Sequence, residues 1–400
     1  MIHKLISPSC SRLSSLATWH SVLGTWHLVL TTCLLALVSF SSCSSSPSVS
    51  SSPVYTPSHS TNFSISTLDT PDSLATSLIS SSNPWQGASG VSAQLLISNG
   101  NPVPDDFSGQ ILPHFARRII CMSSTHIAML QALGVSDHIV GVSGKEYISN
   151  SSIRENPDIP DIGYEGFIDY ETLAAQKPDL VLLFSVNGAS AMEPKLRELN
   201  IPYLYIGDYV EESPLGKAEW IVPVAEVVGL RDKGIQKFKD IEARYLSLRD
   251  SVAALGLSNP KVMVNAPFLD SWFMPSTTSY IARLIGDASA DYVYTKDTGN
   301  SSRPIDLEEA LSLVSQADYW INIGSLSSLS ELKSSFPKFS SAPCVTSGNV
   351  FNNNRITSPG GGNDCYESGV VNPDVILRDM VNILHPGVIT DSLTYYHRLE

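Results

Sequence analysis

Short apolar runs alternate with amphipathic stretches between residues 117 and 206. Leu180 to Phe184 is a continuous apolar run, which is typical of a parallel strand buried on both faces. Helical periodicity lies on either side of it, over residues 168–176 and 191–199. The short links between these segments predict a parallel sheet with helices on both faces.

The pattern becomes purely helical over residues 216–255, with predicted kinks at Pro223 and Gly229. Phe238, Ile241, Tyr245 and Leu248 share one face of its second half. After Pro260 the strand and helix alternation resumes and ends in a helix at 373–384. The predicted class is therefore α/β, with two doubly wound lobes bridged by a single long helix. The predicted boundaries are 111–213 for the first lobe, 214–256 for the bridging helix, 257–388 for the second lobe and 389–400 for a tail.

The N-terminal segment has the features of an export signal. Lys4 and Arg12 are its only Lys or Arg residues, and an apolar run from Val22 to Phe40 leads to Ser41, Ser42 and Cys43. A basic start, an apolar stretch and small residues before a cleavage point predict a signal peptide over 1–42. The placing of Cys43 resembles the lipid-modified cysteine of bacterial lipoproteins. The alternative is a single-pass membrane anchor, for which the apolar run is short.

Residues 43–110 are predicted to form a Ser-rich tether. Eleven of the twenty residues from Ser41 to Ser60 are Ser, and no Lys or Arg occurs between Arg12 and Arg117. Such a composition buries too little apolar surface to offset the entropy of ordering. We therefore expect the folded body to be lipid-anchored through Cys43 on the periplasmic side of a bacterial membrane.

Charge and motif content exclude several classes of protein. The chain has 25 Lys and Arg residues against 39 Asp and Glu, a net charge of −14, so a nucleic-acid binder is not expected. There is no Gly-x-Ser-x-Gly motif, and the serines before His126 suit helix caps, so the chain is not expected to be an enzyme. The sequence contains no Cys-x-x-Cys or His-x-x-x-His spacing, so no structural metal site is predicted, and no resident cofactor is expected.

The cysteines after Cys43 are assigned by context. Cys121 lies in an apolar strand and is predicted to be a buried free thiol. Cys344 and Cys365 flank one loop and would lie in an oxidising compartment, which predicts a disulfide between them. The alternative is two unpaired thiols that the loop geometry keeps apart.

Several stretches between residues 113 and 386 resemble the substrate-binding lipoproteins of ABC importers for iron complexes and cobalamin. The most specific is Ile168-Asp-Tyr-Glu-Thr-Leu-Ala-Ala-Gln-Lys-Pro-Asp-Leu-Val. The others are Arg118-Ile-Ile-Cys-Met-Ser-Ser-Thr-His, Gly141-Val-Ser-Gly, Asp161-Ile-Gly-Tyr, Pro214-Leu-Gly-Lys-Ala-Glu-Trp and Pro373-Asp-Val-Ile-Leu. The resemblance implies a monomer that captures an iron complex, either haem or a ferric siderophore, between its lobes and delivers it to the subunits of an ABC permease. Cobalamin is the first alternative ligand, and a lipoprotein that only recognises a partner on the surface is the second.

A cleft between lobes requires facing loops at the carboxyl ends of the strands. Aromatic residues and Met are frequent in these loops, and flat rings suit a porphyrin, corrin or catecholate face. The predicted ligand-binding residues are Ser124, His126, Tyr164, Phe167, Asn187, Trp272, Phe273, Met274, Arg355 and Tyr366.

Four of these assignments have structural alternatives. Tyr164 could be a surface turn residue, and the bulky residues Trp272, Phe273 and Met274 could belong to the core. Arg355 could be an exposed loop residue rather than the partner of a ligand anion. A lone His such as His126 is more often a residue of a helix start than a ligand.

The resemblance also implies that one acidic residue on each lobe meets the permease. Glu193 and Glu308 are the predicted docking residues, each at the start of a helix. Paired charges far apart would fix the orientation of docking. The alternative is an ordinary acidic first turn, which the helix dipole favours.

Overall fold

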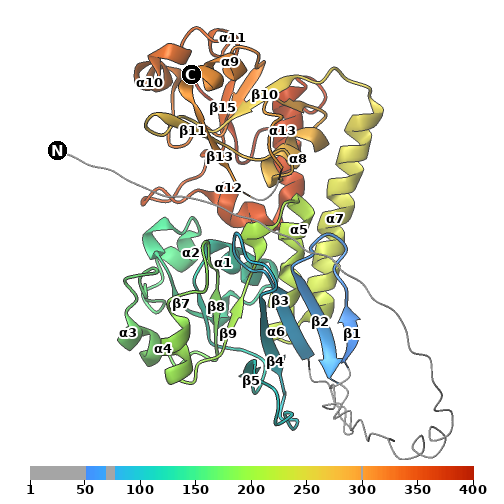
Figure 1. The fold of residues 1–400 in the computed structure, drawn as a ribbon, viewed down its shortest axis with the longest axis vertical. Coiled ribbons are helices and arrows are strands. Elements are labelled where there is room, and N and C mark those ends of the chain that lie inside the picture. The colour runs from blue at the N-terminus through green and yellow to red at the C-terminus, as the bar shows by residue number, and fades with distance from the viewer. Residues whose placement is uncertain (1–50, 69–76, 299–300) are drawn as a thin grey trace, which may run out of the picture. The chain divides into compact units, whose positions relative to one another are not determined.

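The computed structural model describes residues 51–68, 77–298 and 301–400. The chain divides into two units, Met1–Ser48 and Val49–Glu400, and all described residues belong to the second. The predicted signal peptide and Cys43 lie outside the described residues. Figure 1 shows the second unit and labels most of its helices and strands.

The first lobe is built on a parallel sheet, as predicted. Its strand order is β7-β6-β8-β9, and every neighbouring pair is parallel. The strands are β6 (Ile119–Cys121), β7 (Ile139–Val142), β8 (Leu180–Leu183) and β9 (Tyr203–Tyr205). The connecting helices are α1 (Ser124–Ala132), α2 (Ser151–Arg154), α3 (Tyr170–Ala175) and α4 (Glu193–Glu198). All four residues of β8 are buried, in agreement with its continuous apolar run.

The second lobe has a sheet of order β12-β10-β14-β15-β16. Its strands are β10 (Lys261–Val264), β12 (Asp291–Tyr292), β14 (Tyr319–Ile321), β15 (Val350–Asn352) and β16 (His397–Arg398). A separate antiparallel pair joins β11 (Ser271–Met274) to β13 (Arg303–Asp306). Its helices are α8 (Tyr280–Asp287), α9 (Leu307–Val314), α10 (Leu329–Ser335), α11 (Pro343–Thr346), α12 (Asp364–Glu367) and α13 (Pro373–Leu384).

The predicted tail 389–400 is part of this second lobe. β16 pairs antiparallel with β15, and Tyr395, Tyr396 and Leu399 are buried in the core. The tail assignment was therefore wrong. The apolar residues near the C-terminus bury their surface against the sheet, which offsets the cost of ordering the segment.

The bridge between the lobes is a series of three helices rather than one. They are α5 (Pro214–Glu219), α6 (Ile221–Val227) and α7 (Arg231–Ala254), with Pro223 inside α6. Gly229 breaks the series with a φ of +75°, and a Cβ there would lie 2.9 Å from the ring of Phe115. The long helix α7 packs against α6 of the bridge and against α13 of the second lobe. Its predicted apolar face is confirmed, because Phe238, Ile241 and Tyr245 are buried.

The tether predicted for residues 43–110 is wrong for its described part, residues 51–68 and 77–110. This segment forms a five-stranded sheet of order β1-β2-β3-β4-β5. Its strands are β1 (Ser51–Tyr55), β2 (Phe63–Leu68), β3 (Ser77–Ser82), β4 (Ser92–Ile97) and β5 (Gln110–Leu112). Apolar residues alternate with Ser in β2, and Phe63 and Ile65 enter the main core with Ile79 of β3. A period of two places all of them on one face of the sheet, so a modest number of apolar residues suffices.

Hydrogen bonds fasten this N-terminal sheet to the bridge. The carboxylate of Glu219, which is fully buried on α5, accepts from the hydroxyl of Tyr55 at 2.7 Å. It also accepts from the backbone N–H groups of Ser58, His59 and Ser60 at 2.7, 2.9 and 2.7 Å. The sheet is thus attached to the bridge by buried hydrogen bonds.

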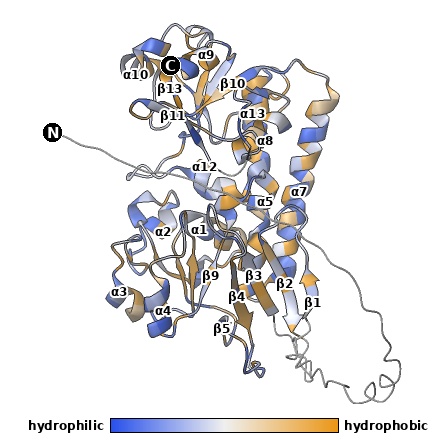
Figure 2. Ribbon diagram, viewed as in Figure 1, coloured by the Kyte–Doolittle hydropathy of each residue, from blue (hydrophilic) through white to orange (hydrophobic). Residues whose placement is uncertain are grey.

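The distribution of apolar residues agrees with this packing. Figure 2 shows mainly apolar strands in the sheets, while α7 alternates between apolar and polar residues. None of the helices described in the structure has the length and apolarity to cross a bilayer.

Candidate ligand-binding site

Two adjoining cavities lie at the carboxyl ends of the strands, where α/β folds place their ligands. The larger has a volume of about 1240 Å³ and is lined by residues of the second lobe. The smaller, of about 410 Å³, is lined by residues of both lobes. Asn322, Asn353 and Tyr366 line both cavities, so the two cavities adjoin at these residues, and together they are called the cleft.

Asparagines form the floor of the larger cavity. Asn265 follows β10, Asn322 follows β14 and Asn353 follows β15, and these three strands are neighbours in the sheet. The φ angles of Asn265 and Asn322 are +65° and +59°, a conformation that Asn adopts more readily than most residues. The side-chain N–H of Asn265 donates to the carbonyl oxygen of Phe273 at 2.9 Å. The floor is thus polar and uncharged.

Strand β11 divides its three bulky residues between core and cavity. Phe273 is 43% exposed and lines the larger cavity, together with Phe268. Trp272 and Met274 are fully buried on the opposite face of the strand, where the ring of Trp272 packs on Trp320. Side chains alternate along a strand, so the middle residue of the three faces the cavity. The assignment of Trp272 and Met274 to the ligand site was wrong.

The polar loop after β15 supplies the remaining predicted residues of the second lobe. Arg355 lines the larger cavity, and Tyr366 lines both cavities with 60% of its surface exposed. These placements bring Phe273, Arg355 and Tyr366 together at one cleft, as the sequence predicts.

The first lobe contributes the start of α1 and a charged group to the smaller cavity. Ser123, Ser124 and Thr125 line it, and the Ser123 hydroxyl accepts from the backbone N–H of Thr125 as the helix cap. Ser124 therefore lines the cleft, as predicted. Lys217 also lines the smaller cavity, and its Nζ donates to the carbonyl oxygen of Asp208 at 2.8 Å.

Two buried carboxyl groups stand beside Lys217. Asp208 and Glu211 also line the smaller cavity, and burial raises the pKa of each. Glu211 accepts from the indole N–H of Trp220 at 2.9 Å and from the hydroxyl of Ser60. These charged groups are engaged by the protein itself.

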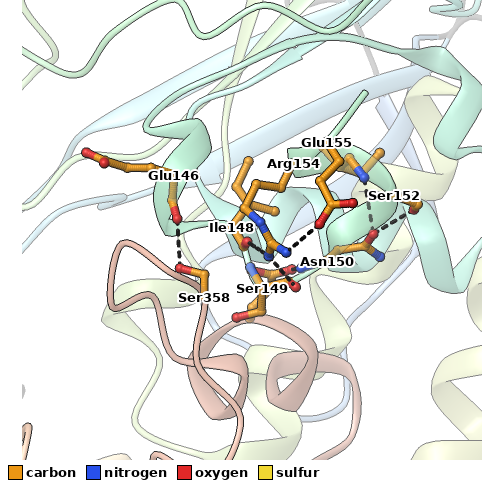
Figure 3. Close-up of polar contacts among 10 residues, drawn as sticks. Glu146, Ile148, Ser149, Asn150, Ser152, Arg154, Glu155 and Ser358 are labelled. Carbon is orange, nitrogen blue, oxygen red and sulfur yellow. Dashed lines mark hydrogen bonds and ion pairs between the residues drawn. The ribbon is translucent and has the colours of Figure 1, made fainter. Parts of the chain in front are cut away.

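Direct hydrogen bonds also join the two lobes beside the cleft. The hydroxyl of Ser358 donates to the carbonyl oxygen of Glu146 at 2.8 Å, as Figure 3 shows. The buried carboxylate of Glu367 accepts from the backbone N–H groups of Ser149 and Asn150 at 2.7 and 3.0 Å. Burial raises the pKa of Glu367.

Two further features support these hydrogen bonds between the lobes. Arg154 donates to the carbonyl oxygens of Ile148 and Ser149 at 2.8 and 2.9 Å, which orders the first-lobe side (Figure 3). Gly362 allows the two backbones to approach, because a Cβ there would collide with the carbonyl oxygen of Tyr147. The loop that lines the larger cavity is therefore also the one that contacts the first lobe.

Comparison with known proteins identifies the architecture. A family model described as "Periplasmic binding protein" matches residues 119–354, more than half of the chain. The chain belongs to the periplasmic binding protein family. The family resemblance and the two-lobed α/β class predicted from the sequence are thereby confirmed. The N-terminal sheet and the loop from Arg355 onward lie outside the matched residues.

Individual relatives of this binding protein are distant. An uncharacterized lipoprotein of Methanocaldococcus jannaschii, MJ0878, is 24% identical over 321 residues, which cover 76% of this chain and 74% of that protein. A periplasmic haem-binding protein from Pseudomonas aeruginosa has a TM-score of 0.57 at 16% identity, covering 71% of this chain and 98% of that one. A periplasmic vitamin B12 binding protein of Vibrio cholerae has a TM-score of 0.51 at 14% identity, covering 68% and 98%. At these identities the likeness to the two structures shows the fold.

His126 is a core residue of the binding protein. It is fully buried on α1 and lines neither cavity as the structure describes them. Burial lowers the pKa of its imidazole to about 3, so the ring is neutral at physiological pH. The ligand assignment was wrong because the helix turns this residue away from the cleft.

Three other first-lobe residues are exposed but lie outside both cavities. The exposed fractions of Tyr164 and Phe167 are 58% and 75%, and their rings pack on each other in an edge-to-face arrangement at 5.5 Å. Asn187 is exposed as well. None of the three lines either cavity as the structure describes them, so the structure does not bring them together with Phe273, Arg355 and Tyr366, and their role in binding stays a prediction.

The predicted disulfide is also wrong. Cys121, Cys344 and Cys365 are free and buried thiols among the described residues. Cys344 belongs to the core of the second lobe, whereas Cys365 belongs to the main core that continues through the bridge. Each side chain packs into a different core, which keeps the two sulfurs apart. The prediction for Cys121 is confirmed.

The predicted docking residues differ in their surroundings. The carboxylate of Glu193 accepts from the hydroxyls of Tyr203 and Tyr205 at 2.8 and 2.6 Å, and its side chain is only 14% exposed. It also pairs with Arg197, so its carboxylate is engaged by the protein itself, and its role in docking stays a prediction. Glu308 is exposed in the first turn of α9.

Sequence reasoning missed the asparagine floor, Phe268 and Lys217. A signal for the floor was present, because an Asn closes each of the runs Val262-Met-Val-Asn, Trp320-Ile-Asn and Val350-Phe-Asn-Asn. Among the described residues, no group of three or more His, Cys, Asp or Glu is placed to hold a metal ion.

Proposed function

We propose that this binding protein captures a preformed metal chelate, an iron complex such as haem or a ferric siderophore, in the cleft between its lobes. The observation that carries the proposal is the cavity of about 1240 Å³ with Phe268 and Phe273 on its wall. Cavities for drug-sized ligands span roughly 300–1,000 Å³, so the ligand is bulkier than a drug. Two exposed aromatic rings suit a flat, partly apolar ligand. The haem-binding neighbour supports this choice.

Cobalamin is the second candidate, favoured by a different observation. Five asparagines line the larger cavity: Asn265, Asn322, Asn353, Asn354 and Asn363. Primary amides pair well with the carboxamides on the periphery of a corrin ring. The vitamin B12 binding neighbour is consistent with this candidate.

The test is a binding titration followed by absorbance. The purified binding protein is mixed with haemin, with a ferric siderophore and with cyanocobalamin, and retention of colour after gel filtration is measured. We expect one chelate to bind with a dissociation constant of 1 μM or lower, about −8 kcal/mol. If none is retained, the chelate function is refuted, and a lipoprotein that only recognises a partner becomes the better hypothesis.

We also propose that the protein is a monomer, anchored through lipid on Cys43, that hands its ligand to an ABC permease. The uncharacterized lipoprotein relative supports the anchor. A Cys43→Ser variant should leave the membrane fraction and lose lipid labelling.

Charge reversal at Glu308 should abolish ligand-stimulated uptake by the cognate importer, if this residue meets the permease. It should leave ligand affinity unchanged, because the residue lies in the first turn of α9 and outside both cavities. Glu331→Lys, at the start of α10, is the matched control.

A further inference from the structure

The smaller cavity differs from the larger one in chemistry as well as in size. Its volume is about 410 Å³, and apolar and aromatic side chains from both lobes form much of its wall. They include Phe184 after β8, Ile281 and Leu284 of α8, Val370 and Ile376. A cavity of about 150 Å³ is enough for a benzene ring, so this one has room for a group of more than twice that size.

The charged residues of the smaller cavity are engaged by the protein. Lys217 donates to the carbonyl oxygen of Asp208, and its Nζ lies 5.6 Å from the ring centroid of Tyr280. Glu211 accepts from the indole of Trp220. Burial raises the pKa of both carboxyl groups, which favours their uncharged forms. A charged ligand group would lose its hydration here without gaining a free partner, so the cavity favours a neutral, largely apolar group.

An unsatisfied acceptor lies where the two cavities adjoin. Asn322 lines both cavities, and its side chain interacts with the hydroxyl of Tyr396. Its oxygen Oδ1 is buried, yet it accepts no hydrogen bond within the described part of the chain. Buried polar atoms of folded proteins are nearly always paired, because an unpaired one costs stability. The oxygen therefore points to a ligand that brings an N–H or O–H donor to this junction.

We propose that the ligand is a chelate with a neutral, largely apolar arm: the chelate occupies the larger cavity, and the arm enters the smaller one and donates a hydrogen bond from its base to Asn322. This inference rests on the proposed function and specifies its ligand further. An acyl chain or an aromatic ring attached through a secondary amide has this chemistry, since the amide N–H is the donor. Haem carries no such arm, so among the proposed iron complexes a ferric siderophore with an apolar arm fits best.

The experiment compares matched pairs of chelates that differ only in the length of one amide-linked arm. The pairs are N-acetyl and N-octanoyl ferrioxamine, the methylamide and the octylamide of one haemin carboxyl group, and the same two amides of a cyanocobalamin monoacid. Dissociation constants are measured by titration calorimetry. For the chelate class that binds, we expect the long arm to bind at least tenfold more tightly, a gain that burial of about two methylene groups would already supply.

Filling the smaller cavity should remove this gain. Ile281→Trp adds a ring at a residue that lines the smaller cavity and not the larger one, so both members of a pair should bind this variant alike. Leu311→Trp is the matched control, because Leu311 is 38% exposed on α9 and lies outside both cavities, and it should retain the full gain. The comparison of the two arms on the unaltered protein stands whether or not Ile281→Trp folds.

The hydrogen bond at the base of the arm is tested through Asn322→Gly, since glycine accepts the φ of +59° at this position. Both members of a pair carry the amide N–H, so we expect both to bind roughly two- to tenfold more weakly, the range of one neutral hydrogen bond. Unchanged affinity would overturn this contact. Equal affinity of short and long arms, or a gain that survives Ile281→Trp, would overturn the arm while the chelate function stands. If no chelate of any pair binds, the proposed function itself fails, and the arm fails with it.

Discussion

The two walls of the cleft use polar side chains in opposite ways. On the first-lobe wall, Asp208, Glu211 and Lys217 are bound to groups of the protein itself. On the second-lobe wall, Phe273 and Arg355 face the cavity with surface that no part of the described chain covers. The difference teaches that a charged residue in a cleft need not contact the ligand. Substitutions on the first wall should lower stability, and substitutions on the second should lower affinity.

The sharpest form of the comparison lies within strand β11. We expect Trp272→Ala to lower the free energy of unfolding by about 3–5 kcal/mol, because it leaves a large cavity in the core. The indole also donates to the carbonyl oxygen of Val264 at 2.9 Å, and that acceptor would lose its partner. Urea denaturation measures the change. A loss below about 1 kcal/mol would place Trp272 outside the core and weaken the assignment of the two strand faces.

The first-lobe wall is tested through Glu211. Glu211→Ala removes the acceptor of Trp220 and Ser60 from a buried site, so we expect the free energy of unfolding to fall by about 2–4 kcal/mol. Ligand affinity, measured at a temperature where the variant stays folded, should not change. The neighbouring Glu212→Ala is the control, since its side chain is 35% exposed and its contact with Arg283 is long, at 3.4 Å. A large loss of affinity without a loss of stability would contradict the comparison.

The second-lobe wall is tested through Phe273. Phe273→Ala should weaken binding of the chelate by roughly tenfold, about 1–2 kcal/mol, if the ring stacks on the ligand. The side chain is 43% exposed, so the melting temperature should move little. Titration of the variant beside Trp272→Ala compares two adjacent residues on opposite faces. Unchanged affinity would exclude Phe273 from the ligand contact.

The smallest effect is expected at Glu367, where the two walls meet. Burial raises the pKa of this carboxyl above its ordinary 4.5, so the folded protein holds its proton to a higher pH than the unfolded chain. The folded state therefore binds more protons in that window, and stability from this group falls as pH rises above about 4.5. Glu367→Gln removes the titration, so the unfolding free energy of the unaltered protein, relative to the variant, should decline with rising pH. A difference that stays constant or increases with pH would contradict the assignment.

The sequence predicted the strands and helices of both lobes more reliably than the cleft. Leu180 to Phe184 could be identified as a buried strand because the continuous apolar run is itself a local signal. Phe273 could not be separated from Trp272 and Met274, since the face of β11 that is buried depends on its pairing with β13. The surroundings of Glu193 could not be predicted for a related reason: its partners Tyr203 and Tyr205 lie on a strand ten or more residues away.

The prediction of an N-terminal tether was wrong because it relied on composition. A high content of Ser suggested a tether, yet the alternating apolar residues of β2 together with Leu78 and Ile79 of β3 were enough to build a sheet. Its stability depends on Glu219, which is 159 residues from Ser60 along the chain and accepts its N–H. No local window of sequence contains both partners.

The sequence by itself determined the α/β class, the two lobes with a helical bridge and the family, because these follow from local periodicity and short motifs along the chain. The tertiary structure alone decided which side chains reach the cleft, where each charge finds its partner and that Cys344 and Cys365 remain free. Those outcomes depend on contacts between residues far apart in sequence, and the burial and hydrogen bonding that stabilise such contacts exist only once the chain has folded.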